Sequence, residues 1–354
     1  MTLPTPPQAL PRSAALSAFV SACLSLGVIA ADAQTVEPKA LCADVTKPAT
    51  DRVTACSSLI DSSSSGPERS SLFNNRCVAW QGQRDWERSL ADCTEAITLN
   101  SQNGRAYANR CLSYYMRGEY DKAVADCNEA IKQLPDLVGP YINRGNISYL
   151  RGDYDGALKD YDEAIRLNPK NALAYGNRGR AWTKKKDFDR AIADFDLSLN
   201  LSPQPNNLVS RGLAWKQKDK LQLAIDDFSD AIRLNPQFAV AYFDRGWTRV
   251  AKEDLQGSLD DFDNAIRLES GNAVYYNERA WALHLLGRDA DGLPDAEKAL
   301  QLRPTYAAAL DTRGHIRAKL GQRDLAIADF KEALALAPDM KSSIDGLKSL
   351  GIDP

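Results

Sequence analysis

The 354-residue sequence lacks the motifs from which most catalytic sites are built. It has no phosphate-binding loop, no metal-ligand motif and no nucleophilic serine framed by glycines, and it contains only two histidines. The repeats described below occupy nearly the whole chain and leave no room for a catalytic domain. We therefore expect a protein without catalytic activity, cofactor or bound metal.

An excess of charge of one sign is also missing. Charged residues make up 26% of the chain, both signs are interspersed, and the formal net charge is −3. Without a basic patch, the sequence offers little electrostatic attraction to nucleic acid or to an anionic membrane. We expect neither of them to be a partner.

Long apolar runs are absent apart from one near the N-terminus, from Ala14 to Ala30. Arg12 precedes this run and Ala31-Asp32-Ala33 follows it, which is typical of a secretory signal peptide. The sequence thus predicts a signal peptide over residues 1–33, cleavage before Gln34 and export to the periplasm or the medium. Two alternatives stay open: the run is an uncleaved membrane anchor, or Cys23 is lipidated as in a bacterial lipoprotein.

The most informative feature that is present is a period. One arginine recurs at a nearly constant interval, and an aspartate follows each arginine at a fixed spacing. The interval of roughly 34 residues indicates a solenoid of stacked supersecondary units. The arginines are Arg76, Arg110, Arg144, Arg178, Arg211, Arg245, Arg279 and Arg313, and the aspartates are Asp92, Asp126, Asp160, Asp194, Asp227, Asp261, Asp295 and Asp329.

Residues 104–137 show what one unit contains. Helical periodicity extends over residues 104–117, is interrupted at Gly118-Glu119-Tyr120 and resumes over residues 121–133. Asp121 is expected to cap the second helix, and Pro135 to end it. Each unit is therefore predicted to be an antiparallel pair of helices joined by a short turn.

These units resemble the tetratricopeptide repeat. The resemblance rests on Tyr107-Ala108-Asn109-Arg110, Gly118-Glu119-Tyr120, Ala123, Ala130 and Pro135, and on matching positions in the next unit. It implies an all-α, right-handed superhelical solenoid of about eight repeats over residues 69–338, which binds a peptide or protein in a concave groove. Residues 34–68 are then a short helical segment with a flexible link at 62–67, and residues 339–354 a capping helix and tail.

A small residue in most first helices is followed, always at the same spacing, by an aromatic residue in the second helix. This regularity predicts that the two helices touch there, with the ring filling the space left by the missing side chain. The pairs are Gly145 and Tyr161, Gly179 and Phe195, Gly212 and Phe228, Gly246 and Phe262, and Gly314 and Phe330.

Cysteines replace this pair in the first two repeats. If the two positions touch, their β-carbons come close enough for a disulfide, which predicts Cys77–Cys93 and Cys111–Cys127. Cys42 and Cys56 are then paired by elimination. The alternative is that the cysteines are small buried core residues with free thiols. Their spacings do not resemble those of a zinc site.

The repeated arginines and aspartates are interpreted as structural, because the same pair in every unit suggests a ladder of charge-assisted hydrogen bonds. The sequence leaves open whether each aspartate meets the arginine of its own repeat or of the next.

The resemblance places one face of each first helix in the groove. The predicted partner-binding residues are Tyr115, Met116, Ile142, Asn146, Tyr149, Arg180, Lys184, Phe243, Trp247, Asn277, Trp281 and His284. Packing between repeats is the alternative role for Trp247 and Trp281. His284 and His315 have no third ligand and are weak evidence for a metal. The basic and amide residues that clamp a C-terminal carboxylate in chaperone-binding members are not evident.

The repeats are irregular at two places. Gly292, Pro294 and Ala296 depart from the pattern in the seventh repeat and predict a kink or a soft point. The junction at Pro203-Gln204-Pro205 is one residue short, which predicts a local change of pitch.

Together these features favour a non-catalytic adaptor of the cell envelope that binds a peptide or protein partner in its groove. The alternative function is a periplasmic protein that captures a small molecule or a glycan in the aromatic part of the groove.

Overall fold

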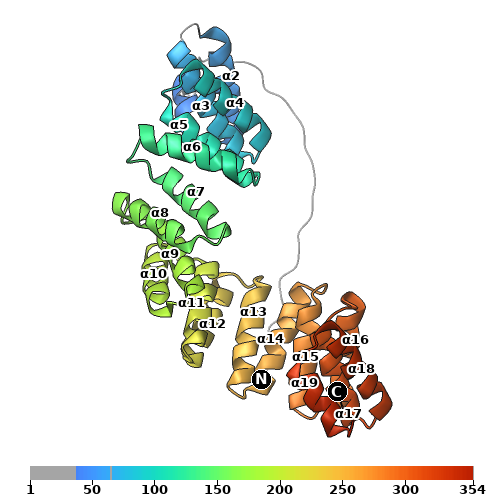
Figure 1. Ribbon diagram of the computed structural model, residues 1–354. Coiled ribbons are helices and arrows are strands. Elements are labelled where there is room, and N and C mark those ends of the chain that lie inside the picture. Colours follow the sequence, from blue (N-terminus) through green and yellow to red (C-terminus); the bar gives the residue numbers. More distant parts are fainter. Residues whose placement is uncertain (1–36, 64–65, 354) are drawn as a thin grey trace, which may run out of the picture.

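The chain folds into an array of α-helices, seen in a computed structural model that describes residues 37–63 and 66–353 (Figure 1). Within these ranges it contains nineteen helices and no strand. The predicted signal peptide and Cys23 lie outside the described residues. The helices are α1 (Pro38–Ala43), α2 (Ala49–Ser62), α3 (Gly66–Gly82), α4 (Trp86–Leu99), α5 (Gly104–Met116), α6 (Tyr120–Gln133), α7 (Val138–Leu150), α8 (Tyr154–Leu167), α9 (Ala172–Lys184), α10 (Phe188–Leu201), α11 (Pro205–Gln217), α12 (Leu221–Leu234), α13 (Ala239–Ala251), α14 (Leu255–Leu268), α15 (Ala273–Leu285), α16 (Asp289–Leu302), α17 (Ala307–Lys319), α18 (Arg323–Leu336) and α19 (Lys341–Ser349).

Consecutive helices pack as pairs, from α3 with α4 to α17 with α18, and the pairs stack into a solenoid. The predicted fold class, an all-α solenoid of about eight helix pairs with a short helical N-terminal segment, is confirmed. No helix among the described residues is long and apolar enough to cross a membrane.

The turn inside each pair uses a left-handed backbone conformation. Gly118 and Gly152 adopt φ angles of 76° and 80°, which glycine tolerates because it lacks a β-carbon. Residues with side chains hold the same turn position in other repeats, as at Lys186 and Glu253 with φ angles of 61° and 63°. The turn geometry is thus kept even where the sequence does not favour it.

The second helix of a pair begins one residue earlier than the sequence suggests in repeat two. The N-cap of α6 is Glu119, and Asp121 lies in the first turn, where its carboxylate pairs with Nη2 of Arg151 at 2.6 Å. The predicted cap at Asp121 is therefore wrong. In the next repeat Asp153 does cap α8, accepting a hydrogen bond from the backbone N–H of Gly156 at 2.9 Å.

The small and aromatic positions touch, as predicted. A β-carbon added at any of the five glycines would lie only 2.6–2.9 Å from a ring carbon of the aromatic partner. Repeat seven has alanines, Ala280 and Ala296, at the two positions that hold glycine and an aromatic residue elsewhere. The side chain of Ile316 from the next repeat packs with these two alanines. Helix α16 continues through Pro294 without interruption.

The arginine and aspartate of each repeat bind each other. In all eight repeats Nε and Nη2 of the arginine donate to the two carboxylate oxygens, at 2.6–3.2 Å. In most repeats Nη1 reaches back to the preceding pair, as from Arg144 to Oδ1 of Asn128 at 2.6 Å. Each arginine therefore ties its own two helices together, and most also fasten their repeat to the one before.

The N-terminal segment is packed onto the solenoid. Ile60 of α2 shares a core with Leu72 and Phe73 of α3, and α3 already begins at Gly66. The flexible link expected at residues 62–67 is thus wrong at both ends, since Ser62 belongs to α2 and Gly66 and Pro67 belong to α3.

Three cysteine pairs lie at disulfide geometry. The Cα–Cα distances are 4.9 Å for Cys42–Cys56, 5.5 Å for Cys77–Cys93 and 5.4 Å for Cys111–Cys127. These are the pairs that the sequence predicts, and oxidation of the thiols in the protein stays a prediction for mass spectrometry.

Helix α19 covers the end of the array. Gly346 lies against the ring of Phe330, so that this ring is held between two glycines, Gly314 and Gly346. The hydroxyl groups of Ser342 and Ser343 both donate to the carboxylate of Asp311 at 2.6 Å. The last apolar face is therefore shielded from water, as a solenoid requires.

Candidate functional site: the inner face of the solenoid

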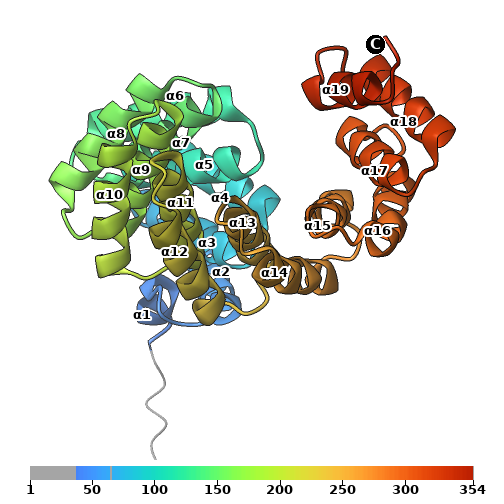
Figure 2. The same ribbon diagram turned by 90° about the horizontal axis from the view of Figure 1, so that it is seen from below.

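The odd-numbered helices line the inner side of the array. Odd-numbered neighbours such as α5 and α7 or α15 and α17 contact each other, whereas within the described residues no two even-numbered helices do. Looking along the array, Figure 2 shows α5, α7, α9, α11 and α13 inside, and α8, α10 and α12 outside. The odd-numbered helices thus form the concave face, and the predicted groove residues are all on these helices.

The N-terminal part of this face carries aromatic and amide side chains. Asn146 accepts hydrogen bonds from the hydroxyl of Tyr161 at 2.8 Å and from Nδ2 of Asn177 at 2.7 Å. Burial raises the pKa of Tyr115, and the positive charge of Arg180 opposes this effect. The structure thus brings predicted groove residues from three repeats together.

Not every predicted residue is accessible in this part. Met116 is exposed and Tyr149 is half-buried. Ile142, in contrast, is 7% exposed and packs with Ala164 and Ala174. Ile142 was expected in the groove, and this expectation is wrong because its side chain completes the core between repeats three and four.

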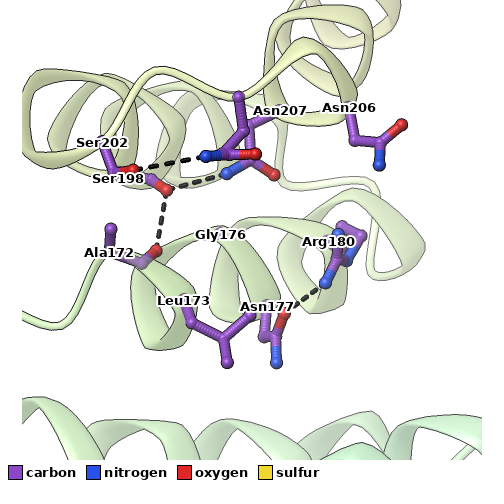
Figure 3. A pocket seen from close by; sticks show the side chains of 10 residues that line it. Ala172, Leu173, Gly176, Asn177, Arg180, Ser198, Ser202, Asn206 and Asn207 are labelled. Atoms are coloured by element: carbon purple, nitrogen blue, oxygen red, sulfur yellow. Dashed lines mark hydrogen bonds between the residues drawn. The ribbon is translucent and has the colours of Figure 1, made fainter. Parts of the chain in front are cut away.

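A polar cavity of about 400 Å³ opens in the middle, between α9, α11 and the end of α10 (Figure 3). Its wall is held by Ser198, whose hydroxyl donates to the carbonyl of Ala172 at 2.7 Å and accepts from Nδ2 of Asn207 at 2.8 Å. Arg180 donates to Oδ1 of Asn177 at the rim. Gly176 lines the cavity at the position that Ile142 holds in the repeat before, and the side chain of Asn207 packs against its α-carbon.

Sequence reasoning missed this cavity although one signal was present. Gly176 occupies a position that is apolar in neighbouring repeats, and the cavity adjoins the short junction where Pro205 begins α11. A β-carbon at Gly176 would lie 2.8 Å from Nδ2 of Asn207, so close packing against the amide requires glycine. Lys184, also predicted, is exposed near the end of α9.

The C-terminal part holds a cluster of rings. Trp281 lies 5.1 Å from His284 and 5.8 Å from His315 between ring centroids, and His315 lies 4.9 Å from Phe330. Both histidines have polar partners: Nδ1 of His284 lies 2.6 Å from Oδ1 of Asp289, and Nε2 of His315 lies 3.0 Å from Oγ of Ser342.

Phe243, a predicted groove residue, contributes mainly to packing. Its ring lies 5.0 Å from that of Tyr275 and 6.1 Å from that of Phe262. Trp247 and Trp281 are only partly buried, so their indoles remain available on the inner face. Lys216 contributes an ammonium group 5.8 Å from the centre of the Trp247 ring.

Two carboxylates on this face were not singled out from the sequence. Burial raises the pKa of Asp244 to about 6, against the attraction of Lys216, and raises the pKa of Glu278 to about 7. Glu278 receives a hydrogen bond from Nδ2 of Asn277 at 3.0 Å. Only the folded structure shows that these two acids are partly buried.

The comparisons with known families agree with this architecture. Tetratricopeptide repeat models match residues 104–137, 172–205 and 307–340, and a TPR repeat model matches residues 145–186. The chain contains tetratricopeptide repeats. Proteins of this type serve as scaffolds for protein interaction through the concave surface of their solenoid. No curated protein matches the sequence.

Solved structures share the fold at low sequence identity. The hetero-tetramer Cut9–Hcn1 of APC/C matches with 16% identity and a TM-score of 0.56, over 88% of this chain and 62% of the Cut9–Hcn1 chain. A tetratricopeptide repeat protein from Parabacteroides merdae matches with 21% identity and a TM-score of 0.54, over 71% of this chain and 99% of its own. The C-terminal part of a TPR repeat-containing protein from Cytophaga hutchinsonii matches with 19% identity and a TM-score of 0.55, over 68% of this chain and 99% of its own.

Proposed function

We propose that this tetratricopeptide repeat protein is a non-catalytic scaffold that binds an extended peptide or protein segment along its concave face. The observation that carries the proposal is the mixed lining of that face. It combines half-buried indoles, an apolar Leu173 that is 57% exposed, and a polar cavity with Asn177 and Arg180 at its rim. Aromatic anchors beside well-placed polar groups are what protein recognition favours.

A continuous series of odd-numbered helices also favours an extended ligand. The cavity near α9 and the indoles of α13 and α15 lie on different repeats, so a single small molecule does not contact both. An extended segment contacts several repeats at once and adds their separate contributions. The alternative, a small polar molecule or glycan, is supported by the volume of the cavity, about 400 Å³, which is in the range of small-ligand sites.

Export to the cell envelope is part of the same proposal. It is supported by the N-terminal sequence pattern and by three cysteine pairs at disulfide geometry, since disulfides persist mainly in oxidising compartments. Fusion of the N-terminal segment, from Met1 to Ala40, to a reporter that is active only after export tests this point separately.

Site-specific photo-crosslinking in cells tests the scaffold function. A photoreactive phenylalanine derivative replaces Leu173 on the inner face, and the matched control replaces Leu325, which is 51% exposed on the outer helix α18. A discrete protein adduct from position 173 and not from position 325 is the expected result. If position 173 gives no protein adduct while a panel of small molecules raises the melting temperature, the alternative function is correct.

A further inference from the structure

Two carboxylates on the inner face of the C-terminal half form no ion pair within 4 Å with any described residue. Among the described residues the carboxylate of Asp244 accepts no hydrogen bond and forms no ion pair within 4 Å. Glu278 accepts only the bond from Asn277. The arginine beside each of them, Arg245 or Arg279, is bound to the aspartate of its own repeat and is not available. Both acids are therefore partly buried without an ion pair that would compensate the loss of hydration.

A neighbouring amide is also left without a donor. Asn277 is 3% exposed, and its Oδ1 is buried with no hydrogen-bond partner among the described residues, whereas its Nδ2 donates to Glu278. A buried acceptor without a donor is unfavourable, and few are found in folded proteins. The carboxylate and the amide oxygen thus form a set of acceptors that lacks a donor.

Two indoles stand beside these acceptors. On α13, Asp244 and Trp247 are separated by just under one helical turn, and on α15, Glu278 and Trp281 have the same spacing, so each acid shares a helix face with an indole. Helices α13 and α15 contact each other on the inner side. We call these residues, with Asn277, the acidic–aromatic face.

The chemistry of the acidic–aromatic face fits a cation with several N–H donors. We propose, on the basis of the scaffold function above, that it binds a lysine or arginine side chain of the partner segment, which donates to Glu278 and to Oδ1 of Asn277. The aliphatic stem and the charge of such a side chain both match a flanking indole. The bound cation replaces the missing donor and favours the ionised carboxylate.

The middle of the inner face is positively charged, opposite to the acidic–aromatic face, and this difference favours one orientation of the bound segment. Arg180 and Lys184 are cationic, while Asp244 and Glu278 are acidic, so a segment with a basic residue at one end has one preferred orientation. The groups that face the two acids are Lys216 and Tyr275 for Asp244, and Asn277 and Tyr306 for Glu278. None of these supplies a cation within hydrogen-bond distance of Glu278.

A positional-scanning library of acetylated, amidated nonapeptides tests the proposal on the full chain at pH 8. We expect binders to share lysine or arginine at one position, and replacement of that residue by norleucine to weaken binding at least tenfold. The double variant D244N/E278Q should lose this preference but not its ability to bind peptides, so it should bind the lysine and norleucine peptides with equal affinity. E278D should retain the preference, and E332Q, an exposed change on α18, should behave as the unmodified chain.

The possible outcomes separate this inference from the scaffold function. Binders without a shared basic residue, or a basic preference that survives D244N/E278Q, overturn the inference and leave the scaffold function intact. Absence of any binding peptide overturns both. E278Q preserves an acceptor for Nδ2 of Asn277, so the variant is expected to fold, and its circular dichroism spectrum checks this. Affinity for the lysine peptide should also fall at least threefold from pH 8 to pH 5, because the carboxylates become protonated.

Discussion

The contact between a glycine and an aromatic ring inside each repeat leads to a prediction in which one substitution has opposite effects at two positions of one helix. Helix α7 contains Gly139, which has no atom within 4 Å of the position of an added β-carbon, and Gly145, whose added β-carbon would lie 2.8 Å from Cε1 of Tyr161. Alanine at either position improves helix propensity, whereas only alanine at Gly145 meets a ring.

The magnitudes follow from these contacts. Gly139→Ala should increase the free energy of unfolding by about 0.5 kcal/mol, because it only restricts the unfolded chain. Gly145→Ala should decrease it by about 1–3 kcal/mol, the usual effect of overpacking. The ring of Tyr161 cannot yield easily, since it is 1% exposed and its hydroxyl donates to Oδ1 of Asn146 at 2.8 Å.

Urea unfolding followed by far-ultraviolet circular dichroism measures both effects. The double variant G145A/Y161A reproduces the alanine pair of repeat seven, so adding G145A to Y161A should change the unfolding midpoint little. The reasoning is refuted if G145A is as stable as G139A, or if G145A is equally harmful with and without the ring.

Three further predictions concern charge and cysteine. Asp160→Ala should lower the free energy of unfolding by about 3 kcal/mol, because it leaves a partly buried arginine unpaired. Asp121→Ala removes an exposed ion pair and should change the free energy of unfolding by less than about 0.5 kcal/mol. The midpoints of urea unfolding compare the two variants. Burial raises the pKa of Glu278 from 4.5 to about 7, so ionisation of this carboxyl destabilises the fold increasingly as the pH rises from about 4.5 to 7. E278Q should therefore raise the free energy of unfolding at pH 8 by up to about 3 kcal/mol, and by much less at pH 5. Unfolding monitored by tryptophan fluorescence at the two pH values measures this difference. Mass spectrometry of the unreduced protein should show Cys77 linked to Cys93, and free thiols at both would contradict the pairing.

Much of the fold was accessible from the sequence because the contacts within a repeat are local and recur. The spacing between Gly179 and Phe195 is found again in other repeats, which indicates one shared contact. The helices that line the groove could be predicted because the resemblance to the tetratricopeptide repeat implies them. The exposure of individual side chains could not, and Ile142 is an example, because burial depends on how neighbouring repeats stack.

The repeated arginine–aspartate pairs also show what the sequence leaves undecided. The spacing of Arg144 and Asp160 suggests an ion pair, but the sequence does not distinguish a partner in the same repeat from one in the next. The structure shows that Nε and Nη2 bind Asp160 of the same repeat while Nη1 reaches Asn128 of the preceding one. Three nitrogen donors on one planar group allow both connections at once.

The sequence by itself thus determined the repeat, its two helices and their internal contact. These depend on interactions within a single repeat, which periodicity reports directly. Only the tertiary structure decided which groove residues are accessible, that a cavity lies beside Gly176, and that among the described residues Oδ1 of Asn277 is buried without a donor next to the partly buried Glu278. These features depend on how adjacent repeats approach one another, and no single repeat contains that information.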